Sequence, residues 1–183
     1  MKKVILILSV ACSLSVNAQM FKGKADGSTV SFFSKSPLED IEAVNKNPVL
    51  VYNSTTGDFQ SAIVMTKFKF KAALMEEHFN ENYVESEKYP SAVFKGKVNE
   101  KIDWTKEGEN KVTVTGKLDL HGVTKDVTLE GTITKKGNDL IVNCTFKIKV
   151  ADYNIKVPSL YVKNIAETVD VTINSIMEPF VKK

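Results

Sequence analysis

The sequence contains no arginine and few of the residues that most catalytic and metal sites use. All 25 basic residues among the 183 are lysines, and there are only two histidines and two cysteines. Proteins that read nucleic acids rely on arginine for bidentate contacts to bases and phosphates, and they carry a basic stripe. Here the net charge is only +3. Nucleic acid is therefore not an expected partner.

Long apolar runs are also absent, apart from one at the N-terminus. Val4–Val16 follows two lysines and precedes a small residue, Ala18. A helix needs about 20 apolar residues to cross a bilayer, whereas this three-part pattern is typical of a secretory signal peptide. We therefore expect residues 1–18 to be cleaved. The mature protein would begin at Gln19 and be periplasmic or secreted, soluble, and without stable membrane insertion. A lipoprotein site at Cys12 is disfavoured, because the residues before it fit such a site poorly.

Cysteine is too rare for disulfide bonds to stabilise the fold. Cleavage after residue 18 would leave Cys144 alone, so the exported domain would have no internal disulfide. A chain of roughly 165 residues is long enough to bury a sizeable core without one. Because Cys144 lies on an apolar strand face, we expect a buried and inert thiol.

Alternation of apolar and polar residues is the dominant pattern of the remaining chain. In Lys111–Leu120, valine, glycine and leucine alternate with lysine, threonine and aspartate, and the same period of two recurs at Val127–Ile133, Val142–Val150 and Val169–Ile173. Strands with one buried and one solvated face are typical of antiparallel sheets. Five further strands are predicted, at Met20–Lys24, Thr29–Ser34, Val49–Ser54, Ser61–Phe70 and Ala92–Val98. Turn signals separate the strands, among them Asp26-Gly27, Thr56-Gly57-Asp58 and His121-Gly122.

Two segments depart from this alternation. Pro37–Asn45 and Lys71–Phe79 are predicted to be short helices, the second because apolar residues recur on one side at helical spacing. No linker or repeat interrupts residues 19–183, so we expect a single all-β domain with about eight or nine strands. Alternation alone does not separate a sandwich from a closed eight-stranded barrel, whose interior holds side chains or one small ligand.

Three stretches of the sequence resemble the YceI-like family. They are His78–Pro90 continuing to Val93–Gly96, Gly116–Val127, and the weaker match Ala151–Ile155. The resemblance implies an antiparallel, eight-stranded or similar, lipocalin-like β-barrel with one or two short helices. It also implies export to the periplasm and a polyisoprenoid or other long-chain amphiphile held inside the barrel. Asn154 stands where the family commonly has glycine, a replacement compatible with a positive φ angle.

The apolar faces carry the candidate site. From composition alone they would fill a closed core, but the resemblance implies that they line a cavity for an isoprenoid or fatty chain. The predicted lining residues are Phe68, Phe70, Leu74, Phe79, Phe94, Val114, Leu118, Leu129, Phe146 and Ile173. The same alternation predicts that Lys95, Lys117, Glu130 and Lys147 point outward. Such a site would bind through apolar burial and accept chains of several kinds.

No catalytic or metal motif is found in the sequence. Neither histidine has the three or four convergent partners that zinc requires, so His78 is expected to be solvated or to cap a helix, and His121 to form hydrogen bonds in a turn. No nucleophile elbow or phosphate loop occurs, and no carboxylate falls on the apolar strand faces. We therefore expect a protein that is not an enzyme, with no metal and no cofactor.

Three functions stay open at this point. The first is a lipid carrier or store. The second is a stress-related or interaction module whose barrel is filled by its own side chains. The third is a lipid-modifying enzyme that uses His78 or His121. The sequence also leaves the oligomeric state open, with a homodimer as one alternative.

Overall fold

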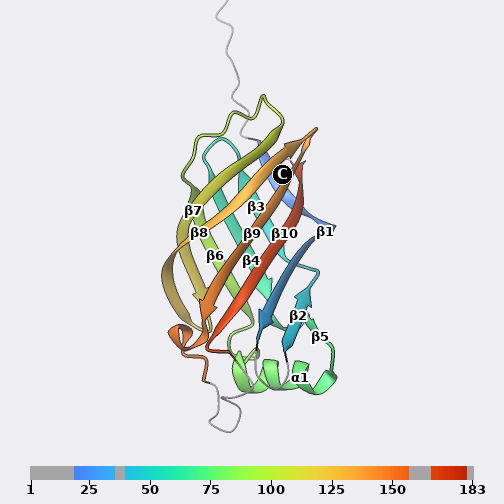
Figure 1. The fold of residues 1–183 in the computed structure, drawn as a ribbon, viewed down its shortest axis with the longest axis vertical. Coiled ribbons are helices and arrows are strands. Elements are labelled where there is room, and N and C mark those ends of the chain that lie inside the picture. Colours follow the sequence, from blue (N-terminus) through green and yellow to red (C-terminus); the bar gives the residue numbers. More distant parts are fainter. Residues whose placement is uncertain (1–18, 36–39, 157–165, 181–183) are drawn as a thin grey trace, which may run out of the picture.

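Antiparallel strands make up most of the described chain, which comprises residues 19–35, 40–156 and 166–180 of a computed structural model (Figure 1). The strands are β1 (Met20–Ser34), β2 (Ile41–Asn45), β3 (Val49–Asn53), β4 (Asp58–Val64), β5 (Phe68–Phe70), β6 (Ser91–Val98), β7 (Gly108–Leu120), β8 (Val123–Lys136), β9 (Asp139–Lys149) and β10 (Thr168–Phe180). The helical elements are η1 (Met65–Lys67), α1 (Ala73–His78), η2 (Phe79–Tyr83) and η3 (Val150–Tyr153). The expected signal peptide, residues 1–18, lies outside the described residues.

Eight strands close into a ring. Their order is β1-β10-β9-β8-β7-β6-β4-β3, and β3 returns to β1. β2 continues this wall beside the second half of β1, and β5 pairs with β2. The prediction of an eight-stranded antiparallel barrel is thus confirmed. Figure 1 shows α1 lying across one end of the barrel, while the β6–β7 connection lies at the opposite end.

Three predictions about individual elements are wrong. Ile41–Asn45 is the strand β2 and not part of a helix, because β1 offers it a pairing edge from Val30 to Ser34; residues 36–39 of that predicted helix lie outside the described residues. The two strands expected before Ser34 are one strand, β1, whose bulge between Gly23 and Ser28 replaces the predicted turn. The single strand expected over 61–70 is divided into β4 and β5 by the turn η1.

Other local predictions hold. The helical turn after residue 70 is present as α1 and continues into η2. The turn between β7 and β8 is formed by His121 and Gly122, both with positive φ, at 53° and 71°. Two-residue hairpins favour this combination, because it matches the twist of the flanking strands. Asn154 also has a positive φ, 56°, as expected from its replacement of glycine.

Two glycines let strands β6 and β7 approach closely. Gly96 and Gly116 face each other across the pair. A Cβ atom built on Gly116 would lie far inside van der Waals contact of the Gly96 Cα and the Lys95 carbonyl oxygen. Glycines inside strands permit such close backbone approach and the sharp coiling of a closing barrel.

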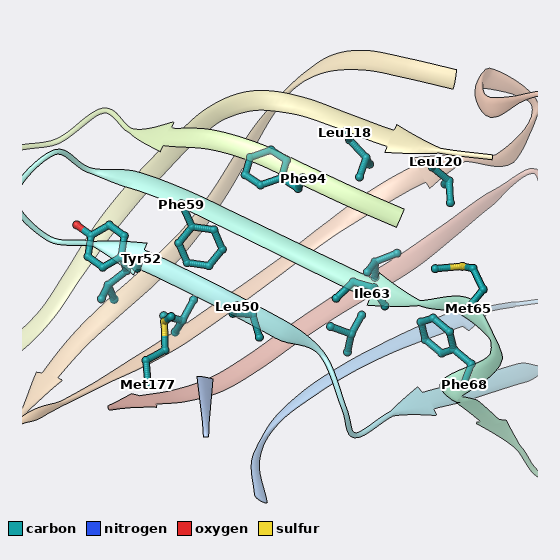
Figure 2. Close-up of a cluster of buried hydrophobic side chains, with 14 of the residues drawn as sticks. Leu50, Tyr52, Phe59, Ile63, Met65, Phe68, Phe94, Leu118, Leu120 and Met177 are labelled. Atoms are coloured by element: carbon teal, nitrogen blue, oxygen red, sulfur yellow. The ribbon is translucent and has the colours of Figure 1, made fainter. Parts of the chain in front are cut away.

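A packed apolar plug fills the end of the barrel opposite α1. It consists of Phe21, Leu50, Tyr52, Val98, Leu140 and Met177, each no more than 4% exposed. Burial raises the pKa of the Tyr52 phenol to about 12. Figure 2 shows Tyr52 and Met177 at one end of the buried cluster, with Met65 and Phe68 at the other. The interior is therefore solid at one end, and the site described below lies between the plug and α1.

None of the helices in the described ranges has both the length and the apolar character that a membrane span would need.

Candidate functional site

A cavity of about 380 Å³ occupies the barrel between the plug and the helical segment. Inward-facing residues of β1, β4 and β6 to β10 form its wall, and α1, η2 and η3 contribute residues at its open end. Ligand cavities in proteins typically measure about 300–1,000 Å³. The barrel is therefore not completely filled by its own side chains.

The wall of the cavity is almost entirely apolar. Among the described residues that line it there is no aspartate, glutamate or lysine. The polar residues on the lining are Ser34, Ser61, His78, Tyr83, Thr132 and Asn143. Burying a charged group in such surroundings would be costly, whereas an apolar chain needs no matching polar group. The arrangement suits a ligand that is mostly hydrocarbon.

Four phenylalanines bring the helical segment against the barrel. They are Phe32 of β1, Phe68 and Phe70 of β5, and Phe79 of η2, and all four line the cavity. The Phe79 ring stacks on Phe32 at a centroid distance of 5.4 Å and lies 5.0 Å from Phe70. Aromatic pairs at these distances contribute about 0.5–1.5 kcal/mol each beyond their buried area. This phenylalanine cluster holds η2 over the end of the cavity.

Nine of the ten residues predicted from the sequence lie on the cavity wall: Phe68, Phe70, Phe79, Phe94, Val114, Leu118, Leu129, Phe146 and Ile173. The charged residues of the same strands, Lys95, Lys117, Glu130 and Lys147, are exposed on the outside. The alternation therefore assigned each side chain to the correct face. A shift of one residue would have exchanged the two sets.

Leu74 is the exception, and its predicted place on the cavity wall is wrong. It is 60% exposed, whereas Met75, His78 and Phe79 of the same helical segment line the cavity. The sequence showed two i, i+4 pairs, Leu74 with His78 and Met75 with Phe79. Phe79 is drawn inward by the phenylalanine cluster, which turns Leu74 toward solvent.

Sequence reasoning also missed several wall residues. Phe32 lies on the inward face of β1, and its alternation with Val30 could have identified it. Phe59 is the second residue of β4, a strand that was predicted to begin only at Ser61. His78 was expected to be solvated or to cap a helix, but it lines the cavity at the helical end. The i, i+4 pairing of Leu74 with His78 placed His78 on the apolar side of the predicted helix, but it did not show which side of that helix faces the barrel.

The second histidine is buried away from the cavity and joins three segments. His121 is 8% exposed; its Nδ1 lies 2.9 Å from the Tyr153 carbonyl oxygen and its Nε2 lies 2.8 Å from a Glu85 carboxylate oxygen. Because a carbonyl oxygen only accepts, Nδ1 donates to it, and Nε2 lies within hydrogen-bonding distance of the Glu85 carboxylate. Both ring nitrogens are thus engaged in linking the β7–β8 turn to η3 and to the segment after η2.

Cys144 lines the cavity as a thiol with little tendency to ionise. Its Sγ donates to the Glu130 carbonyl oxygen at 3.2 Å, and burial raises its pKa to about 11, from an ordinary value of 9.0. Thiolates, not thiols, are the reactive form.

The described residues contain no group of three or more histidine, cysteine or acidic side chains placed to hold a metal ion.

We expect alkylation of Cys144 at pH 8 to be about a hundredfold slower in the folded protein than in urea, because the raised pKa lowers the thiolate fraction by about that factor. The rate should rise as the pH approaches 11. In the same range the free energy of unfolding should fall, because the unfolded thiol ionises from about pH 9. Iodoacetamide labelling with peptide mapping assigns the modified residue. Equal rates in the two states would contradict the burial of this thiol.

The comparisons with known proteins agree with this geometry. The family model of the YceI-like domain matches residues 14–176. A UPF0312 protein of Vibrio parahaemolyticus is 37% identical over 84 residues, which cover 42% of this chain and 41% of the relative. The match thus spans about two fifths of that relative's length.

Two solved structures share the fold. A polyisoprenoid-binding domain from Saccharophagus degradans, implicated in plant cell wall breakdown, superposes with a TM-score of 0.75 at 19% identity, covering 87% of this chain and 98% of that one. BcnA of Burkholderia cenocepacia superposes with a TM-score of 0.72 at 20% identity, covering 84% and 98%. At these identities the likeness shows a common barrel architecture.

Proposed function

The chain belongs to the YceI-like domain family, and on this premise we propose that it binds one amphiphile with a long apolar chain inside its barrel. The observation that carries the proposal is the cavity of about 380 Å³, whose described lining has no charged carboxylate or ammonium group. Each methylene buried in such a site contributes about 0.8 kcal/mol. The polyisoprenoid binding of the structural neighbour from Saccharophagus degradans supports the same ligand class.

A carrier or store is the role we propose for this binding. A lipid-modifying enzyme would need polar groups that converge on the ligand, and the two histidines do not converge. His78 lines the cavity, whereas His121 lies outside it and uses both ring nitrogens in hydrogen bonds. A module with a filled barrel is disfavoured by the size of the cavity. We further propose that the protein acts after export, as the pattern of residues 1–18 suggests.

Leu118→Trp is expected to block the cavity without unfolding the protein. The leucine side chain is 8% exposed and points into the cavity, so a larger ring can use part of the free volume. We expect delipidated Leu118→Trp protein to bind cis-parinaric acid at least tenfold more weakly than the wild type, a loss of about 1.4 kcal/mol. In a fully packed core the same change would instead cost about 1–3 kcal/mol of stability.

The matched control is Thr128→Trp, which adds a ring to the exposed face of β8 next to Leu129. It should change neither binding nor the melting temperature appreciably. Mass spectrometry of an organic extract of the purified protein identifies any bound lipid. If the extract contains no long-chain compound and the delipidated wild type binds no such probe, the proposed function is wrong.

A further inference from the structure

We propose that residues 71–90, which connect β5 to β6, form a lid that opens as a unit, and that the contact between Glu85 and His121 is a latch that keeps it closed. The inference rests on the proposed function, because it concerns how a ligand enters and leaves the barrel. The opposite end of the interior is filled by the plug, so exchange takes place at the end that the lid covers.

The lid completes the cavity wall without being part of the core. Figure 1 shows α1 across the end of the barrel, and the lid contributes five residues to the lining: Met75, His78, Phe79, Tyr83 and Val84. No residue of α1 or η2 is fully buried. α1 has only 6 residues and no side-chain cap at its N-terminus, and helices shorter than about 12 residues are marginal in water. The helical form of the lid therefore depends on its docking to the barrel.

The closed position contains two unfavourable features. The Asn80 side chain donates to the Glu76 carbonyl oxygen at 2.8 Å, but its Oδ1 is buried and has no hydrogen-bond partner among the described residues. Glu85 has a φ of 45°, in the left-handed region that favours glycine. Opening gives the amide oxygen access to water and lets the backbone at Glu85 relax. Both features bring the open form closer in free energy to the closed one.

The latch joins the end of the lid to the barrel wall. The Glu85 carboxylate lies 2.8 Å from Nε2 of His121, whose Nδ1 is held by the Tyr153 carbonyl oxygen at 2.9 Å. Tyr89, also in the lid, packs on the His121 ring at a centroid distance of 4.4 Å. Because the Glu85 side chain is half-exposed, the contact breaks without leaving a charge buried. Opening also withdraws Phe79 from the phenylalanine cluster, so the latch adjusts an equilibrium that favours the closed form.

Hydrogen exchange of the delipidated protein measures the opening of the lid. The amides of Glu76 and Val84 report on it, because they donate to carbonyl oxygens within the lid, those of Ala72 and Phe79. The amides of the β8–β9 ladder report on global unfolding. We expect the lid amides of the wild type to exchange faster than this ladder. Equal protection of the two sets would overturn a lid that opens separately.

Three variants test the latch. Glu85→Ala should speed exchange of the lid amides about threefold to tenfold, the effect of losing one hydrogen bond, and leave the β8–β9 ladder unchanged. Glu87→Ala is the matched control, since it removes an exposed carboxylate two residues further along. Glu85→Gln still offers a hydrogen bond to His121 and should recover most of the protection. Equal acceleration by Glu85→Ala and Glu87→Ala, or of lid and ladder together in Glu85→Ala, would overturn the latch.

Stopped-flow exchange of cis-parinaric acid tests whether the lid controls passage of the ligand. The latch is present in the free and in the bound protein, so its loss should leave the dissociation constant unchanged. Association and dissociation should both become faster in Glu85→Ala, by the factor seen in hydrogen exchange. If the wild type binds the probe but Glu85→Ala exchanges it at the wild-type rate, the gating role is wrong and the proposed function stands. If the wild type binds no probe, both are wrong.

Discussion

We expect Leu118→Asp to leave the protein unfolded or nearly so, with a larger loss in the free energy of unfolding than the other single substitutions proposed. Leu118 faces the cavity directly opposite Phe94 of the neighbouring strand and is 8% exposed. Because no lysine lies on the described lining, a carboxylate there has no cation to pair with. An uncompensated buried charge costs several kcal/mol, against a total stability of about 5–15 kcal/mol for a typical domain.

The matched control for this change is Lys95→Asp. Lys95 follows Phe94 on β6 but points outward and faces Lys117 across the strand pair. An aspartate there would meet a lysine on the exposed face, where charge pairs contribute under about 1 kcal/mol. Urea unfolding followed by Trp104 fluorescence compares the two variants. Similar midpoints for both would show that the inner and outer faces of β6 and β7 are assigned wrongly.

Gly116→Ala is expected to lower the free energy of unfolding by about 3 kcal/mol or more, a large effect for one methyl group. The new Cβ would meet backbone atoms, the Gly96 Cα and the Lys95 carbonyl oxygen, which cannot rotate away as a side chain can. This steric overlap is relieved only if β6 and β7 separate. Their separation weakens the strand pair, which runs from Val93–Asp119 to Val98–Val114.

Gly137→Ala serves as its control. Gly137 lies in the β8–β9 turn with φ of 59° and has no atom within 4 Å of an added Cβ. The methyl group therefore costs only the backbone strain of a left-handed residue, about 1–2 kcal/mol. Thermal and urea unfolding measure both variants. Equal losses would mean that the close approach of β6 and β7 relaxes easily.

The sequence was most informative where one strand face is buried and the other is solvated. Lys111–Leu120 alternates without interruption, and the structure places its apolar residues inward and its lysines outward. The prediction was wrong at Ile41–Asn45, which was expected to form part of a short helix after a possible cap at Ser36. There Ala43 and Asn45 are buried in β2, which pairs with β1 on one side and β5 on the other. Pairing with distant strands outweighed the local preference of these residues for a helix. Which strands will pair cannot be read directly from the pattern of a single sequence.

The presence of a cavity could not be predicted from the sequence patterns. Inward-facing residues such as Phe94 and Leu129 have the same alternation whether a barrel is filled or hollow. The difference depends on how the wall closes and on where large side chains meet, as Tyr52 and Trp104 do at the plug. The position of Leu74 shows the same limit on a smaller scale, since the rotation of α1 is set by Phe79 and its aromatic neighbours.

The pairing of β1 with β10 constrains the order in which the chain can fold. Met20 lies opposite Phe180, so one edge of the first strand obtains its partner from the last strand to be synthesised. At about 5–20 residues per second, the ribosome needs roughly ten to thirty seconds to make the intervening chain. During this interval the emerging sheet has an unpaired edge, which is a template for association with other chains. Ring closure therefore has to wait until β10 has been synthesised, and β1 is the strand of the described barrel whose second edge stays unpaired longest.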